Sequence, residues 1–281
     1  MATVRELLEK ARRQLLAAGV ERPGREAALL LRSLLGMSEA ALLAHDRDPV
    51  PPQVAARFAE RVAARARHMP AAYVVGEREF FGRAFAVDAR VLIPRPETEH
   101  LVELVLALPL PDRARVLDLG TGSGCVAVTL AAERPQWRLT ASDLSPAALA
   151  VARRNAARHG VAPRVSLVAG DLTRGLLASS FDAVAVNPPY VDARSRTALA
   201  AEVRDHEPAP ALFAERGGLA IFERLFGELA AAAPRFLACE VGAGQADDIV
   251  RLAERRGRWR LVARRRDFGG IERDLAWQRT A

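Results

Sequence analysis

The chain of 281 residues contains two cysteines, a single lysine and no apolar run long enough to cross a membrane. Cys125 and Cys239 each lie within apolar sequence, which favours buried free thiols over a disulfide or a metal site. A membrane span needs roughly 18 or more consecutive apolar residues, and the charged N-terminal stretch does not resemble a signal peptide. We therefore expect a cytoplasmic protein without membrane association. The five histidines show no spacing typical of ligands, so no metal is expected.

The formal net charge is +7, and nearly all of the positive charge comes from arginine. The excess is uneven, because the segment from residue 251 to the end contains ten arginines and four acidic residues. A basic surface of this kind can face nucleic acid or an acidic protein surface, and it can equally be a solvated face. Charge alone therefore does not choose a partner.

Residues 1–75 show apolar positions at helical spacing in four or five short stretches. Thr3 and Glu6 have the spacing of a capping box, and Gly19 is placed to end the first helix. We expect a small N-terminal helical bundle. Residues 76–94 contain paired aromatic and β-branched residues around Gly82, which predicts a β-hairpin linking the bundle to the rest.

Within residues 95–281, strand and helix patterns alternate from Arg113 onward, which predicts a doubly wound, mostly parallel sheet of seven strands. The last two strands flank Gly269 and Gly270, and this short connection predicts an antiparallel pair at the sheet edge. The stretches expected to form strands are ARVLDLG, WRLTASDLS, RVSLVAGDL, FDAVAVNPPY, RFLACEVG and two in WRLVARRRDFGGIERDLAWQR.

A glycine loop, VLDLGTGSG, follows the first of these strands and precedes a helix. Glycines at 120, 122 and 124 let a ligand approach the backbone, and the helix N-terminus is expected to offer free N–H groups. The spacing differs from the dinucleotide fingerprint and, with Asp118 ahead of it, resembles motif I of class I methyltransferases, which bind S-adenosylmethionine.

Aspartates end the next two strands. Asp143 is placed to accept hydrogen bonds from ribose hydroxyls, or else to cap the following helix. Asp171 is placed to accept one from an adenine amino group. Ligands of open α/β sheets bind at the carboxyl ends of the strands, which favours the binding role for the glycine loop and both aspartates together.

The stretch NPPY, residues 187–190, follows the fourth strand. An Asn-Pro pair often starts a turn, and neither proline can donate a backbone hydrogen bond. Asn187 supplies an amide oxygen, Pro188 a carbonyl oxygen and Tyr190 a flat face. The combination suits a planar group bearing NH₂, which includes both an amide and an exocyclic base amine. Catalysis would then depend mainly on placing that nitrogen in line with a methyl carbon.

Nearly the whole chain resembles the protein-(glutamine-N5) methyltransferases of peptide chain release factors, the HemK type. The resemblance rests on motifs in the family's order: GEREFFG, LIPRPETE, LDLGTGSGCVAV, NPPY, HEPAPALFA, CEVGAGQ and DFGGIERDL. The stretch IPRPETE at residues 93–99 is the most specific of these. The sister enzymes that methylate a ribosomal protein have a different version of it. Adenine-N6 methyltransferases lack the N-terminal bundle and hairpin.

This resemblance implies a class I, Rossmann-like methyltransferase domain over residues 95–281. It further implies that the enzyme uses S-adenosylmethionine to methylate the glutamine of the GGQ motif in class 1 release factors. The alternatives are a ribosomal-protein glutamine and an exocyclic amine of nucleic acid, and no direct nucleic-acid binding is expected. The implied cofactor contacts are Gly120, Thr121, Gly122, Ser123, Gly124, Asp143, Asp171, Leu172 and Asn187. The implied substrate contacts are Asn187, Pro188, Pro189 and Tyr190, with Asn187 and Pro188 as the catalytic pair.

Two positions depart from the family pattern. Leu172 stands where some members have a tryptophan against the adenine, so apolar packing is expected in place of stacking. Asp274 stands in GGIERDL where an apolar residue is usual, which puts the pairing of the last strand in question.

Overall fold

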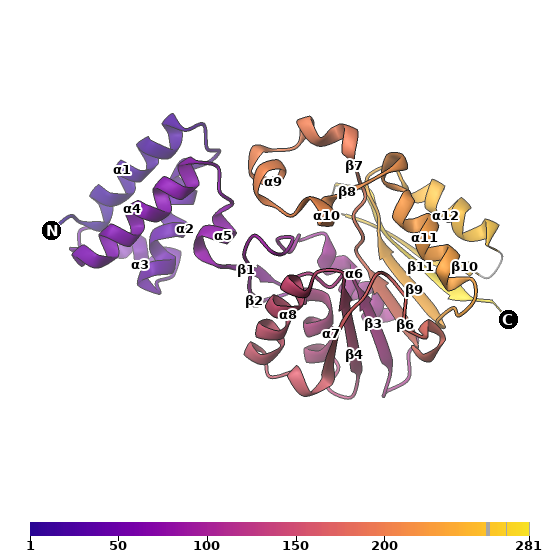
Figure 1. Ribbon diagram of the computed structural model, residues 1–281. Coiled ribbons are helices and arrows are strands. Elements are labelled where there is room, and N and C mark those ends of the chain that lie inside the picture. Colours follow the sequence, from indigo (N-terminus) through magenta and orange to yellow (C-terminus); the bar gives the residue numbers. More distant parts are fainter. Residues whose placement is uncertain (257–258, 268, 281) are drawn as a thin grey trace. The chain divides into compact units, whose positions relative to one another are not determined.

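The computed structural model describes residues 1–256, 259–267 and 269–280, and it divides into two compact units (Figure 1). The first unit comprises Met1–Glu77 and Ala200–His206, and the second comprises Arg78–Leu199 and Glu207–Ala281. Phe268 of the motif DFGGIERDL, like Gly257, Arg258 and Ala281, lies outside the described residues. In the described ranges, no helix combines the length and apolar content needed to cross a bilayer.

The first unit is the predicted helical bundle. Thr3 and Glu6 form the predicted capping box, in which the Glu6 N–H donates to Thr3 Oγ1 at 3.3 Å and the Thr3 N–H donates to Glu6 Oε2 at 2.8 Å. The helices pack around a buried cluster that includes Leu15, Leu30 and Phe58. The helices of this unit are α1 (Val4–Ala17), α2 (Pro23–Leu35), α3 (Glu39–Ala44), α4 (Pro52–Ala66), α5 (Ala71–Val75) and α9 (Ala201–His206).

Helix α9 joins this bundle although it follows the NPPY stretch in the chain. Arg65 of α4 forms ion pairs with Glu26 of α2 at 3.0 Å and with Glu202 of α9 at 2.8 Å. The Arg65 side chain is buried, so these two carboxylates compensate a charge removed from water. The sequence contains no signal for this return of the chain, because α9 is a single short helix with no apolar stripe of its own.

The second unit is built on the predicted sheet. Within the described residues it has seven strands in the order β10-β11-β9-β6-β3-β4-β5, parallel except where β11 meets β9 and β10. The predicted antiparallel pair at the sheet edge is confirmed. The strands are β3 (Arg115–Leu119), β4 (Arg138–Asp143), β5 (Val165–Ala169), β6 (Ala183–Val186), β9 (Phe236–Glu240), β10 (Trp259–Arg266) and β11 (Glu272–Arg279).

Helices cover both faces of this sheet, as Figure 1 shows. Alternate strand residues point to opposite faces, so Val116 packs with α6 and α7 while its neighbour Leu117 packs with α11 and α12. Both cysteines are free and buried, as predicted. The helices are α6 (Thr98–Ala107), α7 (Cys125–Glu133), α8 (Pro146–Arg158), α11 (Ala220–Leu229) and α12 (Ala246–Arg255).

The linking hairpin is shorter than predicted. Its strands are β1 (Glu77–Phe80) and β2 (Arg83–Ala86), joined through Gly82 at a φ of +67°. Residues 87–94 form no strand. Asp88 accepts a hydrogen bond from the backbone N–H of Arg90 at 3.1 Å, and this local turn ends the extended conformation.

Two features between β6 and the C-terminus also differ from expectation. Short strands β7 (Val191–Asp192) and β8 (Phe213–Ala214) pair in parallel beside the sheet and were not predicted. Asp274 does not disturb the last strand, because it pairs in register with Glu240 of β9. The remaining short elements are α10 (Ala209–Leu212) and the 3₁₀ turns Ala162–Arg164, Ala178–Ser180, Ala193–Ala198 and Arg216–Gly218.

Candidate active site

A cavity of about 360 Å³ opens at the carboxyl ends of the parallel strands in the second unit. This is the edge at which ligands of open α/β sheets bind. Most of the predicted site residues line it: Gly120, Gly122, Asp143, Asp171, Leu172, Asn187, Pro188 and Pro189. Thr121, Ser123, Gly124 and Tyr190 do not line it.

The glycine loop follows β3 and is held by Asp118, a buried residue of that strand. Asp118 is buried and accepts hydrogen bonds from Thr121 Oγ1 at 2.6 Å and from the Ala127 N–H at 3.2 Å. Burial raises the pKa of this carboxyl to about 6, against the opposing effect of these hydrogen bonds. Asp118 and Thr121 therefore brace the loop from within the protein.

Backbone N–H groups of the glycine loop are less free than predicted. Those of Thr121, Gly122 and Gly124 donate respectively to the Ser142 carbonyl at 2.9 Å, Asp143 Oδ2 at 2.8 Å and the Thr121 carbonyl at 2.8 Å. The glycines have a different use, since φ lies between +54° and +81° at Gly120, Gly122 and Gly124. A Cβ at Gly124 would lie 3.1 Å from the Cβ of Ala152, so this glycine lets α7 and α8 pack closely.

Asp143 is the last residue of β4 and joins two loops. Its Oδ1 accepts the Ser145 N–H at 2.8 Å, and its Oδ2 accepts the Gly122 N–H. The cap of α8 is Ser145, whose Oγ accepts the Ala148 N–H at 3.2 Å. The capping alternative for Asp143 is therefore wrong. Each carboxylate oxygen keeps further acceptor capacity toward the cavity.

Asp171 and Leu172 follow β5 at the wall of the cavity. Asp171 Oδ2 accepts a hydrogen bond from Arg224 at 2.6 Å, which fixes the carboxylate at that wall. Leu172 has a φ of +52°, an unusual conformation for a residue other than glycine. The Leu172 side chain is half-buried against the cluster around α11, and it supplies an apolar part of the lining. Its predicted contact with the adenine stays a prediction.

Asn187 follows β6 and hydrogen bonds to the start of α6. Its Nδ2 donates to Oγ1 of Thr98 at 2.9 Å, and no donor among the described residues reaches its Oδ1. The backbone carbonyl oxygen of Asn187 lies 4.0 Å from the position that a Cβ of Gly120 would take. The glycine loop and the NPPY stretch thus border the same space.

Tyr190 is turned away from the cavity and toward β9. Its hydroxyl donates to Glu240 Oε1 at 2.9 Å, and its carbonyl oxygen accepts from Gln245 Nε2 at 2.9 Å. A Cβ at Gly242 would lie 3.1 Å from Cδ2 of the Tyr190 ring, and one at Gly218 would overlap the Tyr190 carbonyl. The implied contact of Tyr190 with the substrate stays a prediction, while the position of its ring is fixed on several sides.

The motif IPRPETE is fixed by a residue that sequence reasoning did not single out. Glu207 is buried, and it accepts the Ile93 N–H at 3.1 Å and a hydrogen bond from Arg95 at 2.6 Å. Further along, Glu99 accepts the Phe81 N–H of the hairpin at 2.8 Å. The only signal for Glu207 in the sequence is its place in the motif HEPAPALFA.

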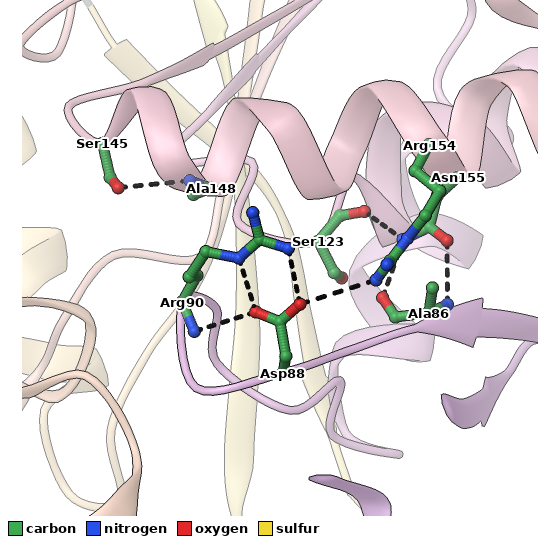
Figure 2. A network of polar contacts seen from close by, with 8 residues as sticks. All are labelled: Ala86, Asp88, Arg90, Ser123, Ser145, Ala148, Arg154 and Asn155. Carbon is green, nitrogen blue, oxygen red and sulfur yellow. Dashed lines mark hydrogen bonds and ion pairs between the residues drawn. The ribbon is translucent and has the colours of Figure 1, made fainter. Parts of the chain in front are cut away.

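The segment after the hairpin is anchored beside the glycine loop, as Figure 2 shows. Buried Asn155 of α8 accepts the Ala86 N–H at 2.8 Å and donates to the Ser123 carbonyl at 2.8 Å. Asp88 pairs with Arg90 at 2.6 Å and with Arg154 at 3.6 Å. Arg90 lines the cavity, so the segment after the hairpin contributes a cation to the candidate cofactor site.

Comparison with known proteins gives matches in both units. A family model described as "PrmC N-terminal domain" matches residues 6–76, and one described as "Methyltransferase small domain" matches residues 98–233. A "Release factor glutamine methyltransferase" of Nitratidesulfovibrio vulgaris is 43% identical over 276 residues, which are 97% of this chain and 94% of the relative. One of Bordetella pertussis is 46% identical over 259 residues, 89% of this chain and 93% of the relative.

Among solved structures, the "hMettl16 catalytic domain in complex with MAT2A 3'UTR hairpin 6" aligns with a TM-score of 0.57. The alignment covers 81% of this chain and 82% of that chain at 18% sequence identity. At this identity the likeness concerns the fold, and it agrees with a Rossmann-like methyltransferase architecture.

Proposed function

Since this chain belongs to the family of release factor glutamine methyltransferases, we propose that it methylates the side-chain amide nitrogen of the glutamine in the GGQ motif of class 1 peptide chain release factors. The proposed methyl donor is S-adenosylmethionine. The release factor is thus a protein substrate, recognised through an exposed glutamine.

The cavity has the chemistry that this donor requires. Asp143 offers carboxylate oxygens to ribose hydroxyls, and Leu172 offers an apolar surface to a purine. Gly120 and Gly122 present backbone without side chains at the same wall. Arg90 and the paired Asp171 and Arg224 add charges of both signs to the lining, which suits a zwitterionic amino acid portion or an amino-substituted base. When bound, S-adenosylmethionine supplies an electrophilic methyl group.

Asn187 and Pro188 are the proposed acceptors for the substrate amide. The Oδ1 of Asn187 and the carbonyl oxygen of Pro188 would accept the two hydrogens of the glutamine NH₂ group. Accepting these hydrogens orients the nitrogen lone pair and increases its electron density. An amide nitrogen is a poor nucleophile, so placing it in line with the methyl group supplies most of the rate enhancement. No strong base is required, because the nitrogen becomes acidic once it is methylated.

The observation that supports this role most directly is the orientation of the Asn187 amide. Thr98 holds the Nδ2 end, so the acceptor end is free of intramolecular donors among the described residues. A binding site for an NH₂ group needs an acceptor that is not already engaged.

The test is methylation of an intact class 1 release factor by the purified protein with methyl-labelled S-adenosylmethionine. Mass spectrometry of the peptide containing GGQ should place one methyl group on the glutamine side chain, and a release factor with that glutamine changed to alanine should accept none. A ribosomal-protein substrate and duplex DNA are run in parallel. Label on either of these, with none on the release factor, would refute the proposal.

A further inference from the structure

A buried carboxylate lies behind the NPPY stretch and is linked to both of its ends, to Tyr190 directly and to Asn187 through Thr98. Glu240 is the last residue of β9, and its side chain is 1% exposed. Its Oε2 accepts a hydrogen bond from Thr98 Oγ1 at 2.6 Å, and its Oε1 accepts one from the Tyr190 hydroxyl at 2.9 Å. Each oxygen of Glu240 thus accepts from one hydroxyl group. Thr98 belongs to the motif IPRPETE, and Tyr190 belongs to NPPY.

The single proton of the Thr98 hydroxyl determines how Asn187 is turned. Because this proton is donated to Glu240, the oxygen of Thr98 can only accept from Asn187. The group of Asn187 that faces Thr98 must then be its NH₂, at 2.9 Å. An amide is planar, so fixing its nitrogen on one side fixes its oxygen on the other.

We propose that Glu240 is a positioning residue of this site: acting through Thr98 and Tyr190, it fixes Asn187 with the amide oxygen toward the substrate and holds the motif around it. This inference rests on the proposed function, since it assigns the substrate nitrogen as the group that the oxygen meets. Glu240 does not line the cavity, so it would act on the substrate only through Thr98 and Tyr190.

The arrangement depends on the negative charge of Glu240. A neutral group at this position could donate to Thr98, whose proton would then turn toward Asn187 and favour the flipped amide. The flipped amide of Asn187 would turn its NH₂ group toward the NH₂ group of the substrate glutamine. The site would then lack the acceptor oxygen. Arg273 of β11 favours the ionised form of Glu240, while Glu97 beside α6 opposes it. Burial raises the pKa of Glu240, and the hydrogen bonds from Thr98 and Tyr190 counter that rise.

Gln245 gives the motif a second anchor that does not involve Glu240. Its Nε2 donates to the carbonyl oxygens of Tyr190 at 2.9 Å and Gly217 at 2.8 Å. The backbone at Tyr190 should therefore stay in place when the tyrosine hydroxyl is removed. This makes Tyr190→Phe a mild variant that removes one of the two donors to Glu240 without dislodging the chain.

The test compares Thr98→Val with Thr98→Ser. Valine has the shape of threonine without the hydroxyl, whereas serine keeps the hydroxyl. We expect Thr98→Val to lower kcat on the release factor roughly 100-fold, as misplacement of a reacting group does. The KM for the release factor and the Kd for S-adenosylhomocysteine should change less than about threefold. Thr98→Ser should recover most of the lost kcat.

A matched control is available in α7. Thr129 is fully buried, and its hydroxyl has no hydrogen-bond partner among the described residues. Thr129→Val makes the same chemical change away from the site and should leave kcat within about twofold. A loss as large as that of Thr98→Val would show that any buried Thr→Val change harms the enzyme, and the inference would fall.

Asn187 can also be observed without turnover, because the chain has two asparagines, Asn155 and Asn187. Selective ¹⁵N-asparagine labelling then gives two side-chain NH₂ signals. In Thr98→Val and in Glu240→Gln, the Asn187 signal should move and exchange faster with water. The Asn155 signal should stay unchanged, because its partners Ala86 and Ser123 are untouched.

The two proposals fail in distinguishable ways. If the wild-type protein does not methylate the release factor, the proposed function is wrong, and the NMR comparison still tests the orientation of Asn187. If the wild type is active, the positioning role is refuted by normal kcat in Thr98→Val or by an unchanged Asn187 signal. Should Thr98→Val not fold, Glu240→Gln takes its place with the same NMR readout, and Tyr190→Phe should lower kcat roughly tenfold.

Discussion

Glu240 and Asp274 are neighbouring carboxylates on paired strands, and their surroundings differ sharply. They lie opposite each other in the β9–β11 register, and both are almost completely buried. Glu240 accepts a hydrogen bond on each oxygen, whereas neither oxygen of Asp274 has a partner among the described residues. Burial, with Glu240 nearby, raises the pKa of Asp274 to about 8.

The difference shows that a buried carboxylate can orient neighbouring groups when it is hydrogen-bonded and only costs stability when it is not. The hydrogen bonds from Thr98 and Tyr190 offset part of the desolvation of Glu240 and favour its ionised form, which can orient two hydroxyl groups. Asp274 has no such compensation, so it is protonated near neutral pH and costs stability when ionised.

Asn187→Ala removes the acceptor that Glu240 is proposed to orient. We expect kcat on the release factor to fall by at least roughly 1,000-fold, since both the oxygen and the positioning of the substrate nitrogen are lost. Cofactor binding should weaken much less, about tenfold or below, because Gly122, Asp143 and Leu172 remain. Single-turnover kinetics and calorimetry with S-adenosylhomocysteine measure the two effects, and near-normal turnover would contradict the acceptor role.

Glu240→Leu removes the carboxylate and leaves the hydroxyls of Thr98 and Tyr190 buried without their acceptor. An unsatisfied buried polar group costs about 1–3 kcal/mol, so the free energy of unfolding should fall by about 2–4 kcal/mol. The kcat should fall roughly 100-fold, through the loss of the Asn187 orientation. Chemical denaturation and initial rates provide the readouts. A variant as stable and active as wild type would mean that Glu240, like Asp274, orients no neighbouring group.

Asp274→Val makes the corresponding change on the neighbouring strand and should have the opposite effect on stability. Replacing a buried carboxyl that has no partner by an apolar side chain of similar size should raise the free energy of unfolding by about 1–3 kcal/mol. The melting temperature should rise by about 2–12 °C, given about 2–4 °C per kcal/mol for a domain of this size. Activity should change little. Destabilisation by this substitution would show that Asp274 has a favourable partner after all.

The pH dependence of the free energy of unfolding should distinguish protonated from ionised Asp274. Its folded pKa of about 8 lies above the ordinary value of 3.8, so the folded protein binds this proton more tightly than the unfolded chain. The stability contributed by that proton is fully present below about pH 4 and is lost as the pH rises through about 8. Thermal unfolding from pH 6 to 9 should therefore show a gap between Asp274→Val and wild type that widens with pH. A constant gap would contradict the raised pKa.

Patterns local in the sequence were sufficient for much of the fold. The alternation of strands and helices predicted the sheet, its antiparallel edge pair and the edge at which Gly120, Asp143 and Asn187 meet. Such predictions succeed because strand period and glycine placement act over a few residues. The hairpin prediction extended too far, since the turn at Asp88 depends on a side-chain hydrogen bond that the composition of residues 87–94 does not reveal.

Residues that act from a distance were not found in this way. Thr98, Glu207 and Glu240 were all within motifs that marked the family, yet the motifs gave no reason for these particular side chains. Thr98 and Glu240 are 142 positions apart, and Ile93 and Glu207 are 114 positions apart. No local pattern specifies which hydroxyl meets which carboxylate over such separations.

The sequence by itself therefore determined the class of fold, the candidate cofactor edge and the family, because these depend on short-range periodicity and on contiguous motifs. Only the tertiary structure decided which way Asn187 faces, that Glu240 is satisfied while Asp274 is not, and that Ala200–His206 belongs with the N-terminal helices. The reason is physical, because burial and hydrogen bonding are properties of groups that folding brings together. Two buried carboxylates therefore differ in pKa and in effect on stability once their neighbours differ.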